Sequence, residues 1–281
     1  MESLTSQRLA TLGHPLRLRV FRLLMRRYPD RVPATELARA LDLKPNTLSA
    51  YLNALRQAGL VTQNRVGTSL RYCIDMDVAR ETLDYLLLDC CRGRPDICSI
   101  SSLPKPNPGT PMIDKKYNVL FLCSGNSARS IFAESILRTE AGDRFSVYSA
   151  GTKPRSELNP FALEILQQRG HDITPLRAKH MAEFQSDDAP DFDFVFTVCN
   201  LAANEDCPAW SGQPISGHWS VPDPVKADGT TAEKSLAFQQ AYGALHNRIT
   251  SFIALPLASL DRIALQSAVD EIAHTHAGDT A

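Results

Sequence analysis

The sequence Val119-Leu120-Phe121-Leu122-Cys123-Ser124-Gly125-Asn126-Ser127-Ala128-Arg129-Ser130 decides the fold of the second half of this 281-residue chain. Its apolar start predicts a short buried strand, and residues 131–137 have the spacing of a helix, so the stretch between them is a strand-to-helix turn. Small residues in such a turn let backbone N–H groups surround an anion at the positive end of the helix. We therefore expect a phosphate-like oxyanion to be bound by Ser124, Gly125, Asn126, Ser127, Ala128 and Arg129.

The first residue of the turn, Cys123, is the candidate nucleophile. The thiol of a free cysteine has a pKa near ~8.5, which can fall to roughly 3.5–7.5 in such surroundings. On this basis we expect Cys123 to be a thiolate at neutral pH. The planar guanidinium of Arg129 can return over the turn and hold two oxygens of a tetrahedral dianion.

This turn resembles the active-site loop of the low-molecular-weight protein tyrosine phosphatases and of the arsenate reductases that share their fold. Two further segments extend the resemblance: residues 149–152 (Ser-Ala-Gly-Thr) and residues 219–224 (Trp-Ser-Val-Pro-Asp-Pro). The resemblance implies that Asp223 protonates the leaving oxygen and that Ser130 donates a hydrogen bond to the Cys123 thiolate. It also implies that Asn126 holds the shape of the loop.

Two chemistries fit these catalytic residues, phosphoester hydrolysis and arsenate reduction. A reductase needs a second thiol to attack the Cys123 sulfur of the adduct. Cys199 follows an apolar run at 192–198 that predicts a strand, and Cys207 comes eight residues later. The resemblance implies that this pair passes the oxidation outward to thioredoxin, whereas glutathione with glutaredoxin is the alternative reductant. Val225 stands where tyrosine phosphatases have an aromatic residue, which favours arsenate as substrate.

A winged helix-turn-helix is predicted in the first half of the chain. Residues 45–58 form an amphipathic helix with Leu48, Leu52 and Leu55 on its apolar face, Pro45 suits its first turn, and Gly59 ends it. Residues 60–65 and 69–73 predict two strands joined by a turn, which form the wing. The residues that we expect to contact DNA are Asn46, Thr47, Ser49, Ala50, Asn53, Arg65 and Arg71.

The charge of the chain is unevenly distributed. Residues 1–103 carry 15 Lys/Arg and 10 Asp/Glu, giving +5, and the remainder carries 15 and 21, giving −6. A basic first half favours nucleic acid as a partner. Residues 14–17 (His-Pro-Leu-Arg) and 55–61 also resemble the ArsR/SmtB family of metalloid-responsive repressors. That resemblance implies a homodimer, formed through the N-terminal domain, that binds operator DNA and leaves it when the metalloid binds.

A helix is predicted at residues 77–91 with the apolar stripe Val78, Leu83, Leu86 and Leu87, and the same resemblance implies that it serves as the dimer helix. Three cysteines lie at its end and just beyond it, at positions 90, 91 and 98. Three thiolates suit arsenite or antimonite, whereas Zn²⁺ normally takes a fourth ligand. We therefore expect a regulatory As(III) site formed by Cys90, Cys91 and Cys98.

Four prolines between Ser101 and Pro111 predict an extended linker. The expected organisation is a winged-helix domain at 1–100, a linker at 101–114 and an α/β domain with a doubly wound parallel sheet at 115–281. The sequence has no nucleotide-binding glycine motif, no secretion signal and no 18-residue apolar run, so we expect a cytoplasmic protein without an organic cofactor. It is interpreted as an arsenite-responsive repressor fused to an arsenate reductase. The alternatives are a phosphatase tethered to a repressor and a regulator that only binds an oxyanion.

Overall fold

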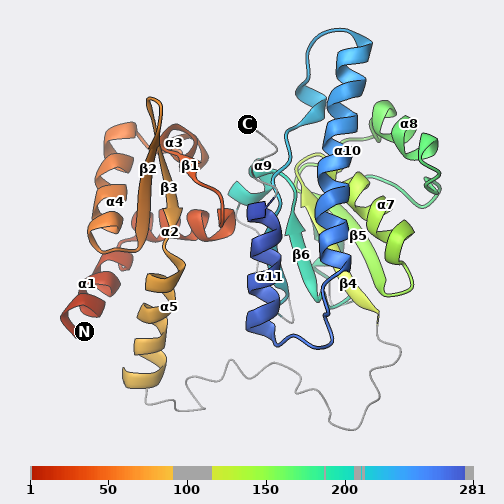
Figure 1. Ribbon diagram of the computed structural model, residues 1–281. Helices are drawn as coiled ribbons and strands as arrows, with labels where there is room; N and C mark the ends of the chain where they lie inside the picture. The colour runs from red at the N-terminus through yellow and green to blue at the C-terminus, as the bar shows by residue number, and fades with distance from the viewer. Residues whose placement is uncertain (1, 91–115, 187, 206–209, 211–212, 276–281) are drawn as a thin grey trace. The chain divides into compact units, whose positions relative to one another are not determined.

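The computed structural model describes residues 2–90, 116–186, 188–205, 210 and 213–275 (Figure 1). The chain divides into two compact units, Met1–Thr110 and Pro111–Ala281. The predicted linker at 101–114 lies outside the described residues. None of the helices in the described ranges has the length and apolar character needed to cross a lipid bilayer.

The first unit combines helices with a three-stranded antiparallel sheet of order β1-β3-β2. The helix predicted at 45–58 and the two wing strands are confirmed, whereas β1, only two residues long, has no periodic pattern from which it could be predicted. In chain order its elements are α1 (Glu2–Leu12), α2 (Pro15–Arg27), β1 (Val32–Pro33), α3 (Ala34–Leu41), α4 (Pro45–Gln57), β2 (Val61–Val66), β3 (Ser69–Ile74), α5 (Met76–Asp84) and a π-helical turn (Tyr85–Cys90).

The sequence determines where helix α4 begins and where it ends. Pro45 occupies the first helical position, where a missing N–H costs nothing, and Gly59 follows the helix with a φ of +76°. Leu48, Leu52 and Leu55 are buried as predicted. They join the core formed with α2 and α3, which fixes α4 on the body of the unit and turns its opposite face outward.

The helix predicted at 77–91 differs from the expectation. Regular α-helix ends at Asp84, and the chain continues as the π-helical turn to Cys90. The residues that α5 buries are Ala79 and Thr82, whereas Leu83 of the predicted apolar stripe is 56% exposed. The predicted stripe is therefore divided, since Val78 packs against the core of its own unit while Leu83 is exposed and Leu86 and Leu87 are half-buried.

The second unit is built on a parallel sheet of order β5-β4-β6-β7, which confirms the predicted fold class. Its elements are β4 (Tyr117–Cys123), α7 (Arg129–Ala141), β5 (Phe145–Gly151), α8 (Pro160–Gln168), a 3₁₀ turn (Met181–Phe184), β6 (Phe194–Thr197), α9 (Asn200–Asn204), β7 (Ile215–His218), a 3₁₀ turn (Pro224–Lys226), α10 (Thr231–Ile253) and α11 (Arg262–Thr275).

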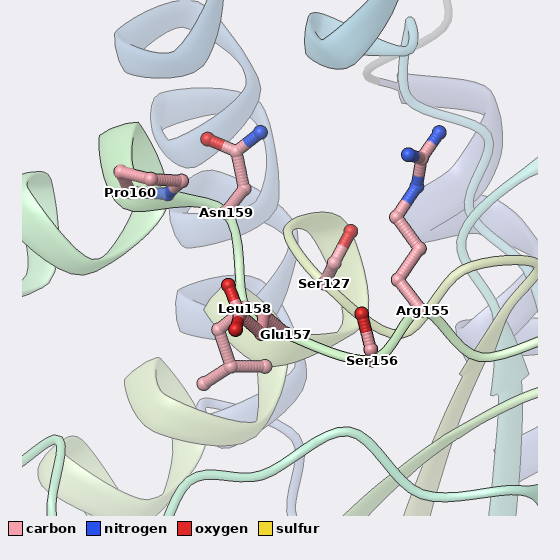
Figure 2. Close-up of a pocket in the computed structure, with 7 residues that line it drawn as sticks. All are labelled: Ser127, Arg155, Ser156, Glu157, Leu158, Asn159 and Pro160. Carbon is pink, nitrogen blue, oxygen red and sulfur yellow. The ribbon is translucent and has the colours of Figure 1, made fainter.

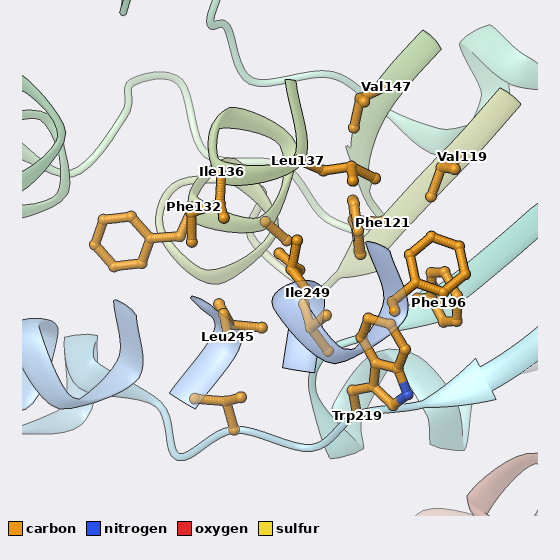
Figure 3. Packing of buried hydrophobic residues seen from close by; sticks show 14 of the residues in the cluster. Val119, Phe121, Phe132, Ile136, Leu137, Val147, Phe196, Trp219, Leu245 and Ile249 are labelled. Carbon is orange, nitrogen blue, oxygen red and sulfur yellow. The ribbon is translucent and has the colours of Figure 1, made fainter. Parts of the chain in front are cut away.

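The central strand β4 divides the core by its alternation. Val119, Phe121 and Cys123 contribute to the large core that α7, α10 and α11 cover, and these helices lie on the viewer's side of the sheet in Figure 1. Figure 3 shows Phe121 of β4 among buried residues of α7 and α10. Leu120 and Leu122 point to the other face, where a smaller cluster with Phe192 covers them. Period-two alternation thus places Cys123 at the carboxyl end of a strand buried on both faces.

A side chain of α11 completes the edge strand β7. The Gln266 amide donates to the carbonyl oxygen of Ser216 (2.7 Å) and accepts from the Ser216 N–H (3.3 Å). Gln266 also donates to the carboxylate of Asp270 (3.0 Å). One side chain therefore satisfies both backbone groups of Ser216 at the edge of the sheet.

Candidate functional site

The turn predicted from the sequence surrounds a cavity of about 210 Å³ at the carboxyl end of β4. Among the described residues no side chain caps α7 at Ala128, so the N–H groups of its first turn remain available to an anion. All the predicted oxyanion-binding residues border this cavity. Its lining residues are Cys123, Ser124, Gly125, Asn126, Ser127, Ala128, Arg129, Lys153, Arg155, Leu201, Asp223, Val225 and Lys226.

Asn126 fixes the shape of the loop through its backbone conformation and its side-chain hydrogen bonds. Its φ of +41° lies in the left-handed region that asparagine tolerates, and its side chain is fully buried. The amide donates to Ser130 Oγ (2.9 Å) and to Ser149 Oγ (2.8 Å), and Oδ1 accepts from the N–H of Lys179 (2.7 Å). These bonds agree with the loop-holding role that the family resemblance implies.

Two hydrogen bonds reach the sulfur of Cys123. The Asn126 N–H donates to Sγ (3.1 Å), and Ser130 Oγ lies 2.9 Å from it. Because Ser130 Oγ accepts from the Asn126 amide, its own hydrogen is free to point at the sulfur. This arrangement agrees with Ser130 as the donor to Cys123.

The predicted direction of the Cys123 pKa is wrong for the unliganded site. Burial raises the pKa of the Cys123 thiol above its ordinary value and the neighbouring Cys199 raises it further, whereas the hydrogen bond of Ser130 and the charge of Arg129 lower it. Sequence reasoning counted the helix and the arginine but not the desolvation, since Cys123 is only 2% exposed. The thiol form of Cys123 therefore predominates at neutral pH in the unliganded site.

Gly151, at the end of β5, allows the loop to approach the sheet. A Cβ at this position would lie 2.6 Å from the carbonyl oxygen of Ser124 and 3.0 Å from Cβ of Asn126. Only glycine fits this contact. The Ser-Ala-Gly motif at 149–151 therefore supports the loop twice, since Ser149 binds Asn126 and Gly151 makes room for it.

Arg129 and Asp223 meet in the cavity. Arg129 Nη2 lies 3.0 Å from Asp223 Oδ2, and Nη1 donates to the carbonyl oxygen of Val221 (3.2 Å). Asp223 Oδ1 accepts from the N–H of Val225 (3.3 Å), which holds the Asp-Pro segment in place. The candidate general acid and the candidate oxyanion clamp thus border the same space as Cys123.

The second predicted thiol also lies in the site. Cys199 follows β6, caps α9 and is 1% exposed, and its Sγ lies 3.6 Å from Ser124 Oγ. It is close enough to Cys123 to raise that thiol's pKa. Cys207, predicted with it, lies outside the described residues.

A buried ion pair beneath the loop was not predicted from the sequence. Lys179 Nζ lies 3.1 Å from Glu134 Oε2, with the two side chains 8% and 3% exposed, and Glu134 also accepts from Ser149. Lys179 and Glu134 are 45 residues apart and belong to no motif, so only the fold brings them together.

The cavity is strongly cationic. Besides Arg129 it is bordered by Lys153, Arg155 and Lys226, and Asp223 is the one carboxylate among the described residues that line it. Lys153 and Arg155 come two and four positions after the Ser-Ala-Gly motif. Their closeness to that motif is the sequence signal from which their place at the site could have been predicted. This excess of positive charge favours a multiply charged oxyanion.

The predicted DNA-contacting face of α4 is exposed. Asn46, Ser49, Ala50 and Asn53 lie on it, and Thr47 is half-buried. Arg56, which the sequence prediction omitted, is exposed on the same helix and donates to Asn53 Oδ1 (3.1 Å). This cation one turn from Asn53 adds a candidate phosphate contact.

The wing strands separate the two arginines that were predicted together. In the β2–β3 register Arg65 is opposite Leu70, whereas Arg71 is opposite Asn64, so their side chains lie on opposite faces of the hairpin. Arg65 is exposed near the turn and Arg71 is half-buried. DNA lying against one face of the hairpin could therefore contact only one of these two arginines. Arg65 is the better candidate because it is more exposed than Arg71.

Only Cys90 of the predicted arsenite site is described, and it is exposed. Cys91 and Cys98 lie outside the described residues. Within the described ranges no group of three His, Cys, Asp or Glu side chains is arranged to hold a metal ion.

Comparison with known proteins agrees with this geometry. The family model described as low molecular weight phosphotyrosine protein phosphatase matches residues 118–264, and one described as a helix-turn-helix domain matches residues 12–64. An arsenate reductase from Bacillus licheniformis is 36% identical over 137 residues, 49% of this chain and 95% of that protein. A glutaredoxin arsenate reductase from Synechocystis sp. is 30% identical over 48% of this chain and 95% of its own length.

A solved ArsR-like transcriptional regulator from Rhodococcus sp. RHA1 aligns with a TM-score of 0.30 at 21% identity, covering 37% of this chain and 96% of that one. The second half of the chain is homologous to arsenate reductases over nearly their whole length. With the matched loop, its nucleophile and its Asp-Pro segment around one cavity, the chain belongs to the low molecular weight phosphotyrosine protein phosphatase family and carries a helix-turn-helix domain ahead of the matched region.

Proposed function

We propose that the second domain reduces arsenate to arsenite. The observation that supports this most directly is Cys199, a second buried thiol beside the catalytic loop, 3.6 Å from Ser124. Hydrolysis of a phosphocysteine needs water and no second thiol, whereas reduction of arsenic needs a thiol that can take up the oxidation. Relatives named arsenate reductases support the same reading.

In this mechanism an oxygen of the bound arsenate dianion takes the Cys123 proton, and Cys123 Sγ attacks arsenic to form a sulfur–arsenic bond. An arsenic–oxygen bond breaks, and Asp223 protonates the departing oxygen. Arg129 and the loop N–H groups hold the remaining oxygens. Cys199 Sγ then attacks Cys123 Sγ, the sulfur–arsenic bond breaks, and its electron pair passes to arsenic. The arsenic leaves as arsenite, and a Cys123–Cys199 disulfide remains. Cys207 can exchange with it to form a Cys199–Cys207 disulfide and free Cys123, and an external thiol system, thioredoxin or glutathione with glutaredoxin, then reduces the remaining disulfide.

The test is arsenite production from arsenate by the purified protein, with the thioredoxin and the glutaredoxin systems supplied separately. Hydrolysis of an aryl phosphate is measured in parallel. We expect arsenite release that depends on a reductant and is lost in Cys199→Ser. Aryl phosphate turnover without arsenite production would show that the domain is a phosphatase. If both activities were absent, the remaining alternative would be a regulator that only binds an oxyanion.

Family membership favours the phosphatase alternative, but the side chains that line the cavity disfavour an aryl substrate. The lining residue after the Asp-Pro pair is Val225, and within the described part of the chain no aromatic side chain borders the cavity to flank a phenyl ring. An anion as small as arsenate fits a cavity of about 210 Å³ without such a partner.

For the first domain we propose an arsenite-responsive repressor that binds operator DNA as a homodimer. The exposed face of α4 with Arg65 supplies the DNA contacts, and exposed Leu83 with half-buried Leu86 and Leu87 supplies apolar surface for a second copy. Arsenite bound by Cys90, Cys91 and Cys98 is the proposed release signal. Gel-shift titration with arsenite tests it, and a complex that persists at saturating arsenite would contradict it.

A further inference from the structure

A second cavity adjoins the catalytic one. It measures about 460 Å³ and is bordered by Ser127, Arg155, Ser156, Glu157, Leu158, Asn159 and Pro160. Figure 2 shows the side chains of Asn159, Ser127 and Arg155 pointing in the same general direction, with Ser127 between the other two. Ser127 and Arg155 border both cavities, so a ligand in the second lies next to the reaction site.

The wall of this cavity is fastened to the catalytic loop. Backbone N–H groups of Thr152, Lys153, Arg155 and Asn159 donate to the carbonyl oxygens of Cys123, Ser124, Gly125 and Ser127, with distances of 2.9–3.1 Å. Asn159 Oδ1 in turn accepts from the N–H of Phe161 and caps α8. The cavity is therefore preformed and fixed in position relative to Cys123.

The lining has the chemistry of a site for a small zwitterion. Arg155 offers a guanidinium for a carboxylate, and Glu157 offers a carboxylate for an ammonium group. Hydroxyls of Ser127 and Ser156 and the amide of Asn159 can bind peptide groups. None of the described residues that line the cavity is aromatic, which disfavours an aryl ligand. The cavity volume lies within the usual range of roughly 300–1,000 Å³ for small-molecule sites.

We propose that this cavity binds a small peptide thiol of the glutathione class, which reduces the Cys123–Cys199 disulfide; the proposal rests on the reductase function above. Cys123 and Cys199 are only 2% and 1% exposed, so the thiol of a folded protein meets them only after the loop moves. A small thiol held beside Ser127 is already at the loop.

The chemistry balances with two thiols. The first glutathione thiolate bonds to Cys123 Sγ, the Cys123–Cys199 bond breaks, and its electron pair and a proton end on Cys199. A second glutathione attacks the glutathione sulfur of the mixed disulfide. Both cysteines are then reduced, and oxidised glutathione leaves.

Binding is tested with S-methylglutathione, which has the charges but no thiol, by calorimetry on the reduced full-length protein. We expect saturable one-site binding that Arg155→Ala and Glu157→Gln each weaken about tenfold or more, the effect of losing a charged hydrogen bond. Glu164→Gln, an exposed carboxylate on α8 outside the cavity, is the matched control and should bind normally. Absence of binding, or binding insensitive to Glu157→Gln, overturns the proposal.

Kinetics separate this proposal from the function on which it rests. We expect Glu157→Gln to lower the ratio of kcat/KM with glutathione to kcat/KM with dithiothreitol about tenfold, because dithiothreitol carries no charge for the cavity to recognise. An unchanged ratio, or reduction supported by thioredoxin alone, overturns the peptide-thiol site. Failure to form arsenite with every thiol removes the reductase, while the calorimetry still decides whether the cavity binds its ligand.

Discussion

At the residue scale, Lys179 supplies a fixed positive charge below the catalytic loop. Its ammonium group meets Glu134, which accepts from Ser149, and Ser149 accepts from the Asn126 amide. The same amide orients Ser130 toward Cys123. The buried ion pair is thus linked to the nucleophile through a continuous set of hydrogen bonds.

Replacing Lys179 by methionine should therefore be costly. Glu134 would keep Arg138 as its remaining cation but lose the ammonium partner of Oε2, and we expect the free energy of unfolding to fall by about 1–3 kcal/mol, with lower turnover because the loop loses its support. Urea unfolding measures the first effect. Arg177→Met is the matched control, since the Arg177–Glu183 pair is 61% and 43% exposed and such pairs contribute at most about 1 kcal/mol. Equal losses in both variants would contradict the role given to Lys179.

The pKa of Cys123 gives a second test at this scale. Because the Ser130 hydrogen bond lowers that pKa, Ser130→Ala should raise it further, and alkylation by iodoacetamide, which follows the thiolate fraction, should move to higher pH. Mass spectrometry of the Cys123 peptide follows the reaction. Ser135→Ala is the control, because the buried Ser135 hydroxyl has no partner among the described residues. A profile that does not move would exclude Ser130 as the donor.

The candidate site could be predicted from sequence where its residues are contiguous or belong to a motif. Cys123, Arg129 and Asp223 were found in this way, and Cys199 was found as a thiol at a strand end. Lys179 and Glu134 could not be found, because nothing local distinguishes a buried charge from a solvated one. For the same reason the desolvation that raises the Cys123 pKa was missed.

At the scale of elements, the approach of the loop to β5 depends on Gly151. In Gly151→Ala the new methyl group would meet the backbone of Ser124 at 2.6 Å, and we expect a loss of about 1–3 kcal/mol in unfolding free energy, as in other overpacked sites. Arsenate turnover should fall together with stability. The control is Gly243→Ala within α10, where a Cβ meets nothing within 4 Å and should stabilise the helix by about 0.5–1 kcal/mol. Thermal unfolding of the two variants distinguishes them.

Helix α11 contributes a pH dependence of stability. Burial raises the pKa of Asp270 to about 6, although the hydrogen bond from Gln266 lowers it. With an ordinary pKa near 3.8 in the unfolded chain, the folded protein binds more protons between these values, so unfolding free energy should decrease as pH rises from about 4 to about 6. Asp270→Asn should remove this decrease, as urea midpoints at pH 4.5 and 6.5 would show. A pH dependence identical to that of the parent protein would contradict the assignment.

Sequence periodicity predicted the type of most elements, because each has one clear pattern. The helix ends were accurate where proline or glycine defines them, as at Pro45 and Gly59. The π-helical turn at Tyr85–Cys90 was not predicted, since the apolar spacing that suggested one long helix cannot distinguish the two windings. The opposite orientation of Arg65 and Arg71 depends on strand register, which their separation in sequence does not reveal.

At the scale of the whole molecule, the two units carry separable proposed roles. Cys123→Ser should abolish arsenite formation and leave operator binding intact, because the nucleophile belongs to the second unit alone. Replacing Cys90, Cys91 and Cys98 together by serine should leave turnover intact and remove release from DNA by arsenite. Gel shifts and turnover assays on both variants check this. If Cys123→Ser also prevented release by added arsenite, the separation would be wrong.

The contact between the Gln266 amide of α11 and the edge strand β7 affects how much of the C-terminal part of the chain can be removed. The outer edge of a parallel sheet is a template on which a second chain can add a strand, and here Gln266 already binds both backbone groups of Ser216. A chain ending before α11 would expose that edge together with the apolar side chains that Leu265 and Val269 now cover. Such a truncated protein should accumulate as intermolecular aggregates even where its catalytic loop is complete, so solubility rather than chemistry sets the minimal length of the domain.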